Sequence, residues 1–175
     1  MMVTLSQILG SRDRRAAREK ELLRLFPGCS LVCLTVIPPG SEKRSKLSVA
    51  VGSEGVRAVS AAFGEHIVFA DTQDLETGFE HYAVVDMDPL AAKRRAIAVE
   101  EEHPLGRLMD IDVMGEDGIP LERASSGAPP RRCLICDKPA HECMRSRTHT
   151  PEELLSVWRE TVRSCPLTGT SQNTP

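Results

Sequence analysis

Apolar residues recur along this chain with two different periods, which distinguish the expected strands from the expected helices. Residues 30–37 (SLVCLTVI) form a continuous apolar run that ends at two prolines, which is typical of a buried strand. Residues 108–114 alternate instead, so their even-numbered and odd-numbered side chains are expected on opposite faces of a sheet. The same reasoning predicts helices at residues 11–26, 43–63, 89–103 and 151–163, and strands at 30–37, 66–70, 79–85, 108–114 and 119–123.

The ends and interruptions of these elements follow from particular residues. Ser11 is expected to cap the first helix, because its side chain can accept a hydrogen bond from a free backbone N–H. Gly52 and Gly55 interrupt the helical spacing of the second helix and predict a kink or an early break there. The polar residues 71–78 (DTQDLETG) are expected to form a loop.

The order of the elements predicts the fold class. Strands and helices succeed one another without internal repeats, which favours an α+β fold: a single sheet of about five strands, helices packed mainly on one face, and a cysteine-containing C-terminal segment. With 175 residues, of which 41% are apolar, the chain can form one ordinary core. Residues 1–165 are therefore expected to be a single domain, and residues 166–175 a disordered tail.

Composition and charge argue against several classes of protein. No apolar run approaches the roughly 20 residues of a membrane-spanning helix, and the N-terminus lacks a signal-peptide pattern. We therefore expect a cytoplasmic protein whose six cysteines are mostly reduced or bound to metal. A net charge of −3 and an aromatic content of 3% argue against nucleic-acid binding. Basic residues cluster at 12–24 and 131–147, which suits a small polyanion or an acidic protein.

Asp110 and Asp112 are the first candidates for chemistry. Two residues apart in a strand, their side chains would leave one face about 7 Å apart, where they could share a Mg²⁺ ion with substrate phosphates. A polar strand face turned to solvent is an equally simple interpretation of the pair alone. Gly106 and Arg107 just upstream favour the metal site, because glycine permits close approach to a ligand and arginine binds phosphate in bidentate fashion.

Further arginines could bind the phosphates of such a substrate. Arg131 and Arg132 follow two prolines, whose stiffness would hold them in place beside a cysteine cluster, although an arginine pair alone is more often a solvated surface feature. Arg12 lies at the predicted start of the first helix, where free N–H groups attract anions, although a simple N-cap is the plainer interpretation. Carboxylates for a cation beside arginines for phosphates predict phosphoryl or nucleotidyl transfer from a polyphosphate.

A cysteine cluster lies in the C-terminal part of the chain. It offers four candidate zinc ligands, with His141 as a spare: Cys133, Cys136, Cys143 and His149. The first pair has the C-x-x-C spacing of a zinc knuckle, but the second half is irregular, so the pattern indicates zinc less strongly than two regular pairs would. Reduced cysteines packed as small apolar residues are the alternative interpretation.

Three blocks of sequence resemble a known family. They are SRDRRAAR (11–18), HPLGRLMDIDV (103–113) and PPRRCLICDKPAHECMRSRTH (129–149), and the likeness extends over about residues 5–160. The chain resembles the holo-acyl-carrier-protein synthase of citrate lyase, also called apo-citrate lyase phosphoribosyl-dephospho-CoA transferase. The Asp-x-Asp strand is also similar to that of nucleotidyltransferases, although the Gly-Ser turn and helix that usually precede their carboxylates are missing from this stretch.

The resemblance implies a bacterial enzyme with a particular reaction and partners. Such an enzyme moves the 2′-(5″-phosphoribosyl)-3′-dephospho-CoA group from its triphosphate precursor to a serine of the citrate lyase acyl-carrier (gamma) subunit and releases diphosphate. The candidates fit this reaction as follows: Asp110 and Asp112 would bind Mg²⁺, either an aspartate or His103 would accept the serine proton, and Gly106, Arg107, Arg131, Arg132 and Arg12 would contact the substrate.

Two other classes of function remain open at the level of sequence. The first is a non-catalytic, zinc-stabilised module that binds an acidic carrier protein; the Asp-x-Asp strand argues against it, because a binding module needs no paired carboxylates beside an arginine. The second is a zinc protein that binds nucleic acid, which the negative net charge and the scarcity of aromatic residues disfavour.

Overall fold

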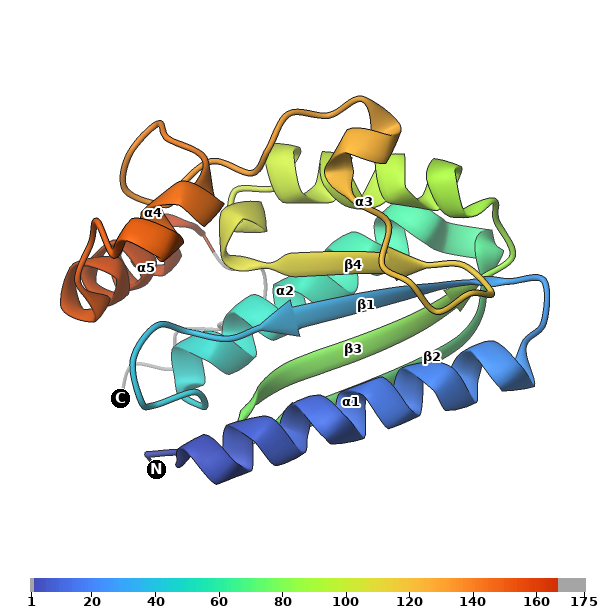
Figure 1. Ribbon diagram of the computed structural model, residues 1–175, viewed down its shortest axis with the longest axis horizontal. Coiled ribbons are helices and arrows are strands. Elements are labelled where there is room, and N and C mark those ends of the chain that lie inside the picture. Colours follow the sequence, from blue (N-terminus) through green and yellow to red (C-terminus); the bar gives the residue numbers. More distant parts are fainter. Residues whose placement is uncertain (1, 167–175) are drawn as a thin grey trace.

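A single antiparallel sheet organises residues 2–166, the part of the chain that the computed structural model describes (Figure 1). Within these residues the sheet has four strands in the spatial order β2-β3-β1-β4: β1 (Ser30–Val36), β2 (Ile67–Leu75), β3 (Gly78–Val85) and β4 (Asp110–Met114). The helices of the same residues are α1 (Leu5–Leu25), α2 (Lys46–Phe63), α3 (Pro89–Glu102), α4 (Ala140–Ser146) and α5 (Pro151–Ser164). The expected α+β class is confirmed, with four strands instead of about five. Nearly all of the predicted tail, 166–175, lies outside the described residues.

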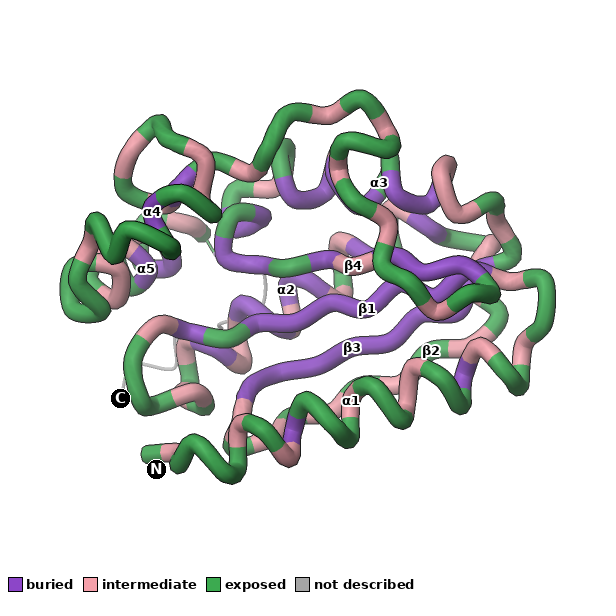
Figure 2. Tube along the Cα trace, in the orientation of Figure 1, coloured by how far each residue is buried: buried purple, intermediate pink, exposed green. Residues whose placement is uncertain are grey.

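Strand β1 forms the centre of the core. It is buried along its whole length between β3 and β4, as its continuous apolar run predicts (Figure 2). On one sheet face its even-numbered residues pack against α2, α3 and α5. On the other face, Leu31 and Cys33 pack with Tyr82 against Leu22 of α1. Helices therefore cover both faces: α2, α3 and α5 lie on one face, in line with the expectation of helices mainly on one side, and α1 lies on the other.

Helix α1 begins earlier than the sequence analysis predicted. A capping box in which Thr4 and Gln7 exchange hydrogen bonds starts the helix at Leu5. Ser11 is therefore not an N-cap but a buried residue in the middle of α1, where its hydroxyl lies 2.7 Å from that of Thr77. Arg12 is exposed on the same helix, far from the free N–H groups of its first turn. The anion site predicted at Arg12 was argued from a helix start at that point, and this argument is wrong because the helix begins at Leu5.

Helix α2 is continuous, so the predicted kink or break at its two glycines is wrong. A Cβ atom added at Gly52 would lie 2.3 Å from the ring of Phe79, and one at Gly55 would lie 2.6 Å from Leu34. The glycines therefore let α2 approach the sheet closely, and this packing outweighs their low helix propensity.

The hairpin of β2 and β3 includes residues that were expected to form a loop. Residues 71–75 continue β2 and pair with β3 as far as Leu75 opposite Gly78. Their burial alternates between half-buried and exposed, as in a strand with one solvated side. The polar composition therefore indicated an exposed edge strand and not a loop.

The strand predicted at residues 119–123 does not form. Only an isolated bridge joins Pro120 to Met114, with a hydrogen bond of 2.8 Å from the Leu121 N–H to the Val113 carbonyl. Pro120 has no N–H to extend the ladder, and residues Arg123–Ser126 form a 3₁₀ turn. The chain then runs outside the sheet to α4 and α5 (Figure 1). Among residues 2–166, no helix is long and apolar enough to cross a membrane.

Candidate active site

Asp110 and Asp112 lie on β4 at one edge of the sheet. Asp110 stands opposite Thr35 and Asp112 opposite Cys33, so both carboxylates point to the sheet face that α1 covers. The predicted alternation is confirmed from Asp110 onward. It is wrong for Leu108, which belongs to a 3₁₀ turn (Gly106–Leu108) and packs in the core on the opposite face.

The outer edge of β4 is occupied by two side chains from α3. Glu100 accepts a hydrogen bond of 2.9 Å from the N–H of Ile111, and Lys93 donates one of 3.3 Å to its carbonyl. Glu100 and Lys93 are 6% and 4% exposed, so these bonds satisfy charged groups that would otherwise be costly to bury. The strand that carries the two aspartates is therefore fixed from both sides.

Arg131 joins the C-terminal segment to this strand. Its guanidinium donates to Asp110 Oδ1 at 3.0 Å, to the Arg107 carbonyl at 2.8 Å, and to the Met109 carbonyl. Arg123 approaches from the same side and donates to Glu100 at 2.7 Å. The structure thus brings Arg131 beside Asp110, although 20 residues separate them in the chain.

The other predicted site residues have different surroundings. Arg107 donates to the carbonyls of Cys133 and, at 3.3 Å, Arg132, so it ties down the backbone of the C-terminal segment. The Arg132 side chain is 72% exposed and lies 3.8 Å from Asp137. His103 ends α3 and its Nδ1 accepts a hydrogen bond of 3.1 Å from the Leu105 N–H.

Gly106 has a packing role that explains its identity. A Cβ atom there would lie 2.5 Å from the carbonyl oxygens of Val99 and Glu100, the last turn of α3. Because backbone atoms cannot move aside as a flexible side chain can, only glycine fits under the end of this helix. Gly106 is also buried, so packing alone explains why this position is a glycine, and no contact with a ligand is needed.

Three adjoining clefts surround Arg131. The carboxylate cleft, about 490 Å³, is lined among others by Lys93, Glu100, Asp110, Asp112 and Arg131. The arginine cleft, about 330 Å³, is lined by Arg107, Arg123, Arg131 and Arg132 together with Glu100 and Glu101. The mixed cleft, about 460 Å³, has Arg107, Arg131 and Arg132 beside apolar residues that include Leu134, Met144 and Leu154. Arginines and carboxylates therefore line neighbouring clefts that share Arg131.

Burial dominates the electrostatics of the carboxylate cleft. Burial, and then the charge of Asp110, raises the pKa of Asp112, while Lys93, Arg15 and Arg131 oppose the shift. Burial likewise raises the pKa of Glu100 against the opposing effects of Arg131, the Ile111 N–H and Arg123. Glu100, Asp110 and Asp112 thus place three carboxylates in one cleft, and such oxygen ligands suit a divalent cation.

A second set of buried polar groups lies between α1 and the sheet. Glu80 is 4% exposed and accepts hydrogen bonds from the Tyr82 hydroxyl at 2.5 Å, from Arg15 at 3.4 Å and from Ser11 at 3.5 Å. Burial, together with this bond to Glu80, raises the pKa of Tyr82. Arg15 also acts on Asp112 electrostatically, so these groups border the carboxylates on the α1 side.

The sequence analysis missed Lys93, Glu100, Arg123, Arg15 and Glu80. A signal for two of them exists: Lys93 and Glu100 are seven residues apart, so they share the buried side of α3 with apolar residues such as Ala96. Glu80 is similarly a charged residue within β3, a strand that is buried along its whole length. Charged residues at core positions of a predicted element therefore mark partners of the site, because burial requires a counter-charge or hydrogen bond.

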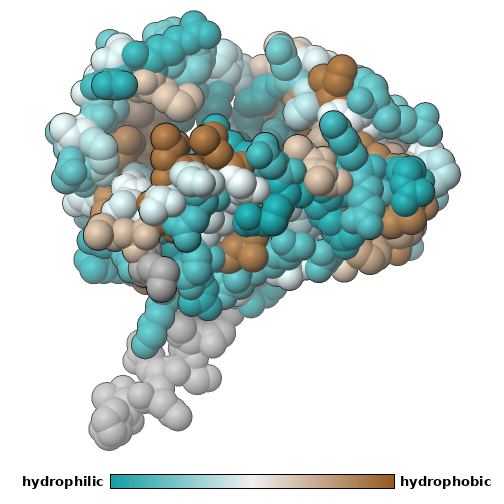
Figure 3. Space-filling model, turned by 60° about the horizontal axis from the view of Figure 1, so that its bottom comes forward, coloured by the Kyte–Doolittle hydropathy of each residue, from teal (hydrophilic) through white to brown (hydrophobic). Residues whose placement is uncertain are grey.

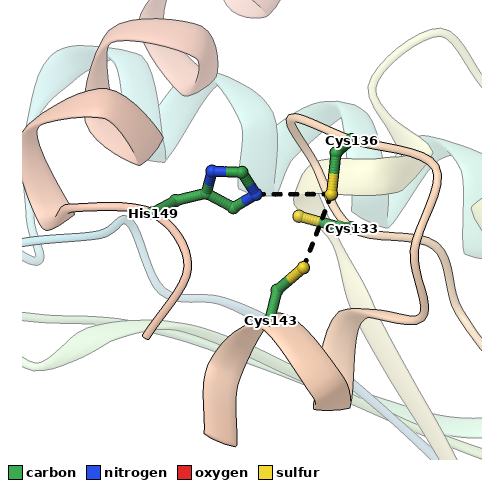
Figure 4. Close-up of side chains that lie close together, drawn as sticks. All are labelled: Cys133, Cys136, Cys143 and His149. Atoms are coloured by element: carbon green, nitrogen blue, oxygen red, sulfur yellow. Dashed lines mark hydrogen bonds between the residues drawn. The ribbon is translucent and has the colours of Figure 1, made fainter. Parts of the chain in front are cut away.

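The cysteine cluster converges in space. Sγ of Cys133, Cys136 and Cys143 and a ring nitrogen of His149 all lie within 4.8 Å of one another, whereas His141 is not part of the group (Figure 4). Burial opposes ionisation of Cys133, but N–H groups of Cys136 and Ile135 that donate to its sulfur lower its pKa to about 7. This Cys₃His group, which the irregular spacing indicated only weakly, could hold a metal ion.

Comparison with known proteins identifies the family. The model of the family "Apo-citrate lyase phosphoribosyl-dephospho-CoA transferase" matches residues 3–165. A relative from Streptococcus pyogenes serotype M18 (strain MGAS8232), named "Probable apo-citrate lyase phosphoribosyl-dephospho-CoA transferase", is 35% identical over 93% of this chain and 86% of its own length. An "Apo-citrate lyase phosphoribosyl-dephospho-CoA transferase" from Escherichia coli O7:K1 (strain IAI39 / ExPEC) is 36% identical over 88% of this chain and 85% of its own length. The chain thus belongs to the apo-citrate lyase phosphoribosyl-dephospho-CoA transferase family.

Proposed function

We propose that the protein transfers the phosphoribosyl-dephospho-CoA group from its triphosphate precursor to a serine of the citrate lyase acyl-carrier subunit and releases diphosphate. The names of the relatives support the transfer to apo-citrate lyase. The observation that carries the proposal is the contact of Asp110 with Arg131 at 3.0 Å, where the carboxylate cleft meets the arginine cleft. Groups for a cation and groups for phosphates thus meet at one point.

The donor set of the carboxylate cleft fits Mg²⁺. Asp110 and Asp112 offer carboxylate oxygens from one strand face, and Mg²⁺ prefers oxygen ligands that it shares with substrate phosphates. Bound there, the ion would neutralise charge on the phosphates as diphosphate leaves. Asp110 would then exchange its bond to Arg131 for the cation, which frees the Arg131 guanidinium to turn toward the phosphates.

The chain's own residues bind the triphosphate and receive the proton. Arg131 and the exposed Arg132 present guanidinium groups to the leaving diphosphate. Arg107 donates a hydrogen bond to the Arg132 carbonyl and so holds the backbone that carries these two arginines. Asp110 and Asp112 are the carboxylates that could accept the serine proton. His103 suits this role less, since Nδ1 already accepts the Leu105 N–H, which places the ring proton on Nε2.

The test is transfer to the isolated carrier subunit. Apo-acyl-carrier subunit is incubated with the protein, the triphosphate precursor and Mg²⁺, and its intact mass is measured together with the released diphosphate. We expect a mass increase equal to the phosphoribosyl-dephospho-CoA group with an equal amount of diphosphate. Asp110→Asn protein is the matched control, for which the mass should stay unchanged over the same time.

The outcome also separates the catalytic proposal from the binding module. A non-catalytic, zinc-stabilised module would bind the carrier subunit without changing its mass. Binding without any mass increase, from folded protein with precursor and Mg²⁺ present, would therefore exclude the transferase and leave the module.

A further inference from the structure

Two pairs of ligand atoms in the Cys₃His group have nearly the spacing of a tetrahedral metal site, and all four atoms lie within 4.8 Å of one another. Sγ of Cys136 lies 3.5 Å from Sγ of Cys143 and 3.4 Å from Nε2 of His149. Bond lengths of about 2.3 Å to sulfur and about 2.0 Å to nitrogen place neighbouring ligands of a tetrahedral zinc ion roughly 3.5–3.8 Å apart. Little movement therefore separates these four side chains from such a site (Figure 4).

The local backbone is shaped to bring the four residues together. A bridge between Arg132 and Pro139 forms a small hairpin, in which the Cys133 N–H donates to the Lys138 carbonyl at 2.8 Å. The turn of this hairpin carries Cys136 and returns the chain, so that the sulfurs of Cys133 and Cys136 both belong to the group whose ligand atoms lie within 4.8 Å of one another.

The second half of the group comes from α4 and the turn after it. Cys143 is a buried residue of this short helix. Arg147 ends the helix with a φ of 48°, a left-handed conformation that non-glycine residues seldom adopt, and the Thr148 N–H bonds to the Cys143 carbonyl at 3.1 Å. This reversal returns the chain so that His149 points at Cys136.

Residues 116–150 have almost no apolar core of their own. In this range only Cys133 and Cys143 are buried. A segment of this kind needs a covalent or metal crosslink to hold one conformation. A disulfide between Cys136 and Cys143 would leave Cys133 and His149 without a role. The sulfurs of Cys136 and Cys143 also lie 3.5 Å apart, well beyond the S–S bond length of about 2.05 Å.

We propose that Cys133, Cys136, Cys143 and His149 bind one structural Zn²⁺ ion. Three soft thiolates with one imidazole select zinc over the hard cations that suit the carboxylate cleft. Four protein ligands leave no open position, so the ion stabilises the fold and takes no part in the transfer.

The zinc site also fixes the arginines of the neighbouring cleft. Arg131 and Arg132 immediately precede Cys133, whose carbonyl accepts a bond from Arg107. Zinc therefore anchors the segment at the residue after the two arginines and holds Arg131 where it meets Asp110. This consequence for catalysis rests on the proposed function, whereas zinc binding itself does not.

Metal content of the purified full chain is the first test. Protein produced with zinc in the medium is dialysed against EDTA and its metals are measured. We expect about one equivalent of zinc, and loss of this zinc in Cys136→Ser and His149→Ala. The matched controls, Cys165→Ser and His141→Ala, lie outside the group and should retain it. Less than about a tenth of an equivalent in the unaltered protein, or equal zinc in all four variants, would overturn the proposal.

Cobalt substitution keeps the test decisive if the variants fail to fold. The unaltered protein is reconstituted with Co²⁺ in place of zinc and its absorption spectrum is recorded. We expect the intense visible bands of a tetrahedral site together with a thiolate-to-cobalt charge-transfer band, and both should disappear when Zn²⁺ is added. A spectrum without the charge-transfer band would exclude thiolate ligands, whatever the activity of the protein.

Discussion

At the scale of single residues, the site depends on charges that the fold buries only in part. Asp110 is 65% exposed on its side chain, so it can exchange Arg131 for a cation. Asp112 is less exposed and stands beside the buried Lys93. The two aspartates therefore occupy different positions: Asp110 lies at the entrance of the carboxylate cleft and Asp112 lies deeper within it.

Removal of either charge should abolish transfer. For Asp110→Asn and Asp112→Asn we expect at least about a hundredfold loss of the transfer rate, because electrostatic stabilisation of the transition state is typically worth several kcal/mol. The rate is measured from the mass increase of the carrier subunit. Near-normal rates in both variants, with unchanged melting curves, would show that the aspartates do not have this role.

Asp112→Asn should also stabilise the protein without Mg²⁺ at neutral pH. Burial raises the folded-state pKa of Asp112, so ionisation costs folding free energy above that pKa. Below the unfolded-state pKa of about 3.9 the residue is protonated in both states and the cost disappears. Thermal unfolding should therefore show a higher midpoint for Asp112→Asn at pH 7 and a smaller difference in acid. The exposed Asp13→Asn serves as the control, and an Asp112→Asn midpoint below the unaltered one at pH 7 would contradict the prediction.

Arg131 and Arg132 should respond differently to replacement. Arg131→Lys keeps the charge but loses the fork that bonds Asp110 and two carbonyls, so we expect at least about a tenfold loss of turnover and a lower melting midpoint. Arg132→Ala removes an exposed side chain and should raise the KM for the precursor with the midpoint unchanged. Steady-state kinetics and thermal unfolding of both variants check this, and identical behaviour of the two would refute the distinction.

At the scale of elements, the close approach of α2 to the sheet means that a larger residue at Gly52 should destabilise the fold. Gly52→Ala should lower the free energy of unfolding by about 1–3 kcal/mol, because the new methyl group meets the ring of Phe79. Gly10→Ala in α1 is the control: its methyl group would meet nothing closer than 3.8 Å, so better helix propensity should stabilise the protein by up to about 1 kcal/mol. Denaturant unfolding measures both, and stabilisation by Gly52→Ala would contradict the packing argument.

Elements whose pattern is set locally were predictable from the sequence. The apolar run of β1 indicated a buried strand, and the alternation of β4 indicated a strand with two different faces. The start of α1 and the absence of the fifth strand were missed although local signals exist, the Thr4–Gln7 capping box and the missing N–H of Pro120. The continuity of α2 was not predictable, because it depends on the close approach of its glycines to Phe79 and Leu34, which are distant in the chain. Tertiary packing there outweighs local propensity.

The placement of the main candidate residues was predictable from the sequence, and that of their neighbours was less so. Asp110 and Asp112 share a face, and Arg131 lies beside them, as the sequence analysis expected. Lys93 and Glu100 were missed, because their role arises only when α3 packs along the edge of β4. Residues that complete a site from another element leave no local signal beyond a charge at a core position.

At the scale of the whole molecule, the sheet with its helices and residues 116–150 differ in what holds them together. The first has apolar cores on both faces, whereas the second has only two buried residues. Hydrogen exchange followed by mass spectrometry should therefore be slowest in β1 and faster across 116–150. In Cys136→Ser we expect a further increase within 116–150 and none in β1. Equal acceleration of β1 would show that the two parts unfold together.

The face of the molecule that Figure 3 turns forward is mostly hydrophilic, with separate hydrophobic patches. A partner protein that contacts this face would meet mainly polar and charged groups, which affect the rate of association more than its strength.

Lys93 and Glu100 also affect whether a partner segment can pair with the outer edge of β4. A sheet edge with free N–H and C=O groups accepts an incoming segment as an additional strand. At β4 both groups of Ile111 are already bonded to α3, so this form of recognition is closed beside the two aspartates. If the proposed transfer is correct, the segment that carries the acceptor serine therefore reaches the carboxylate cleft without pairing with β4 at Ile111.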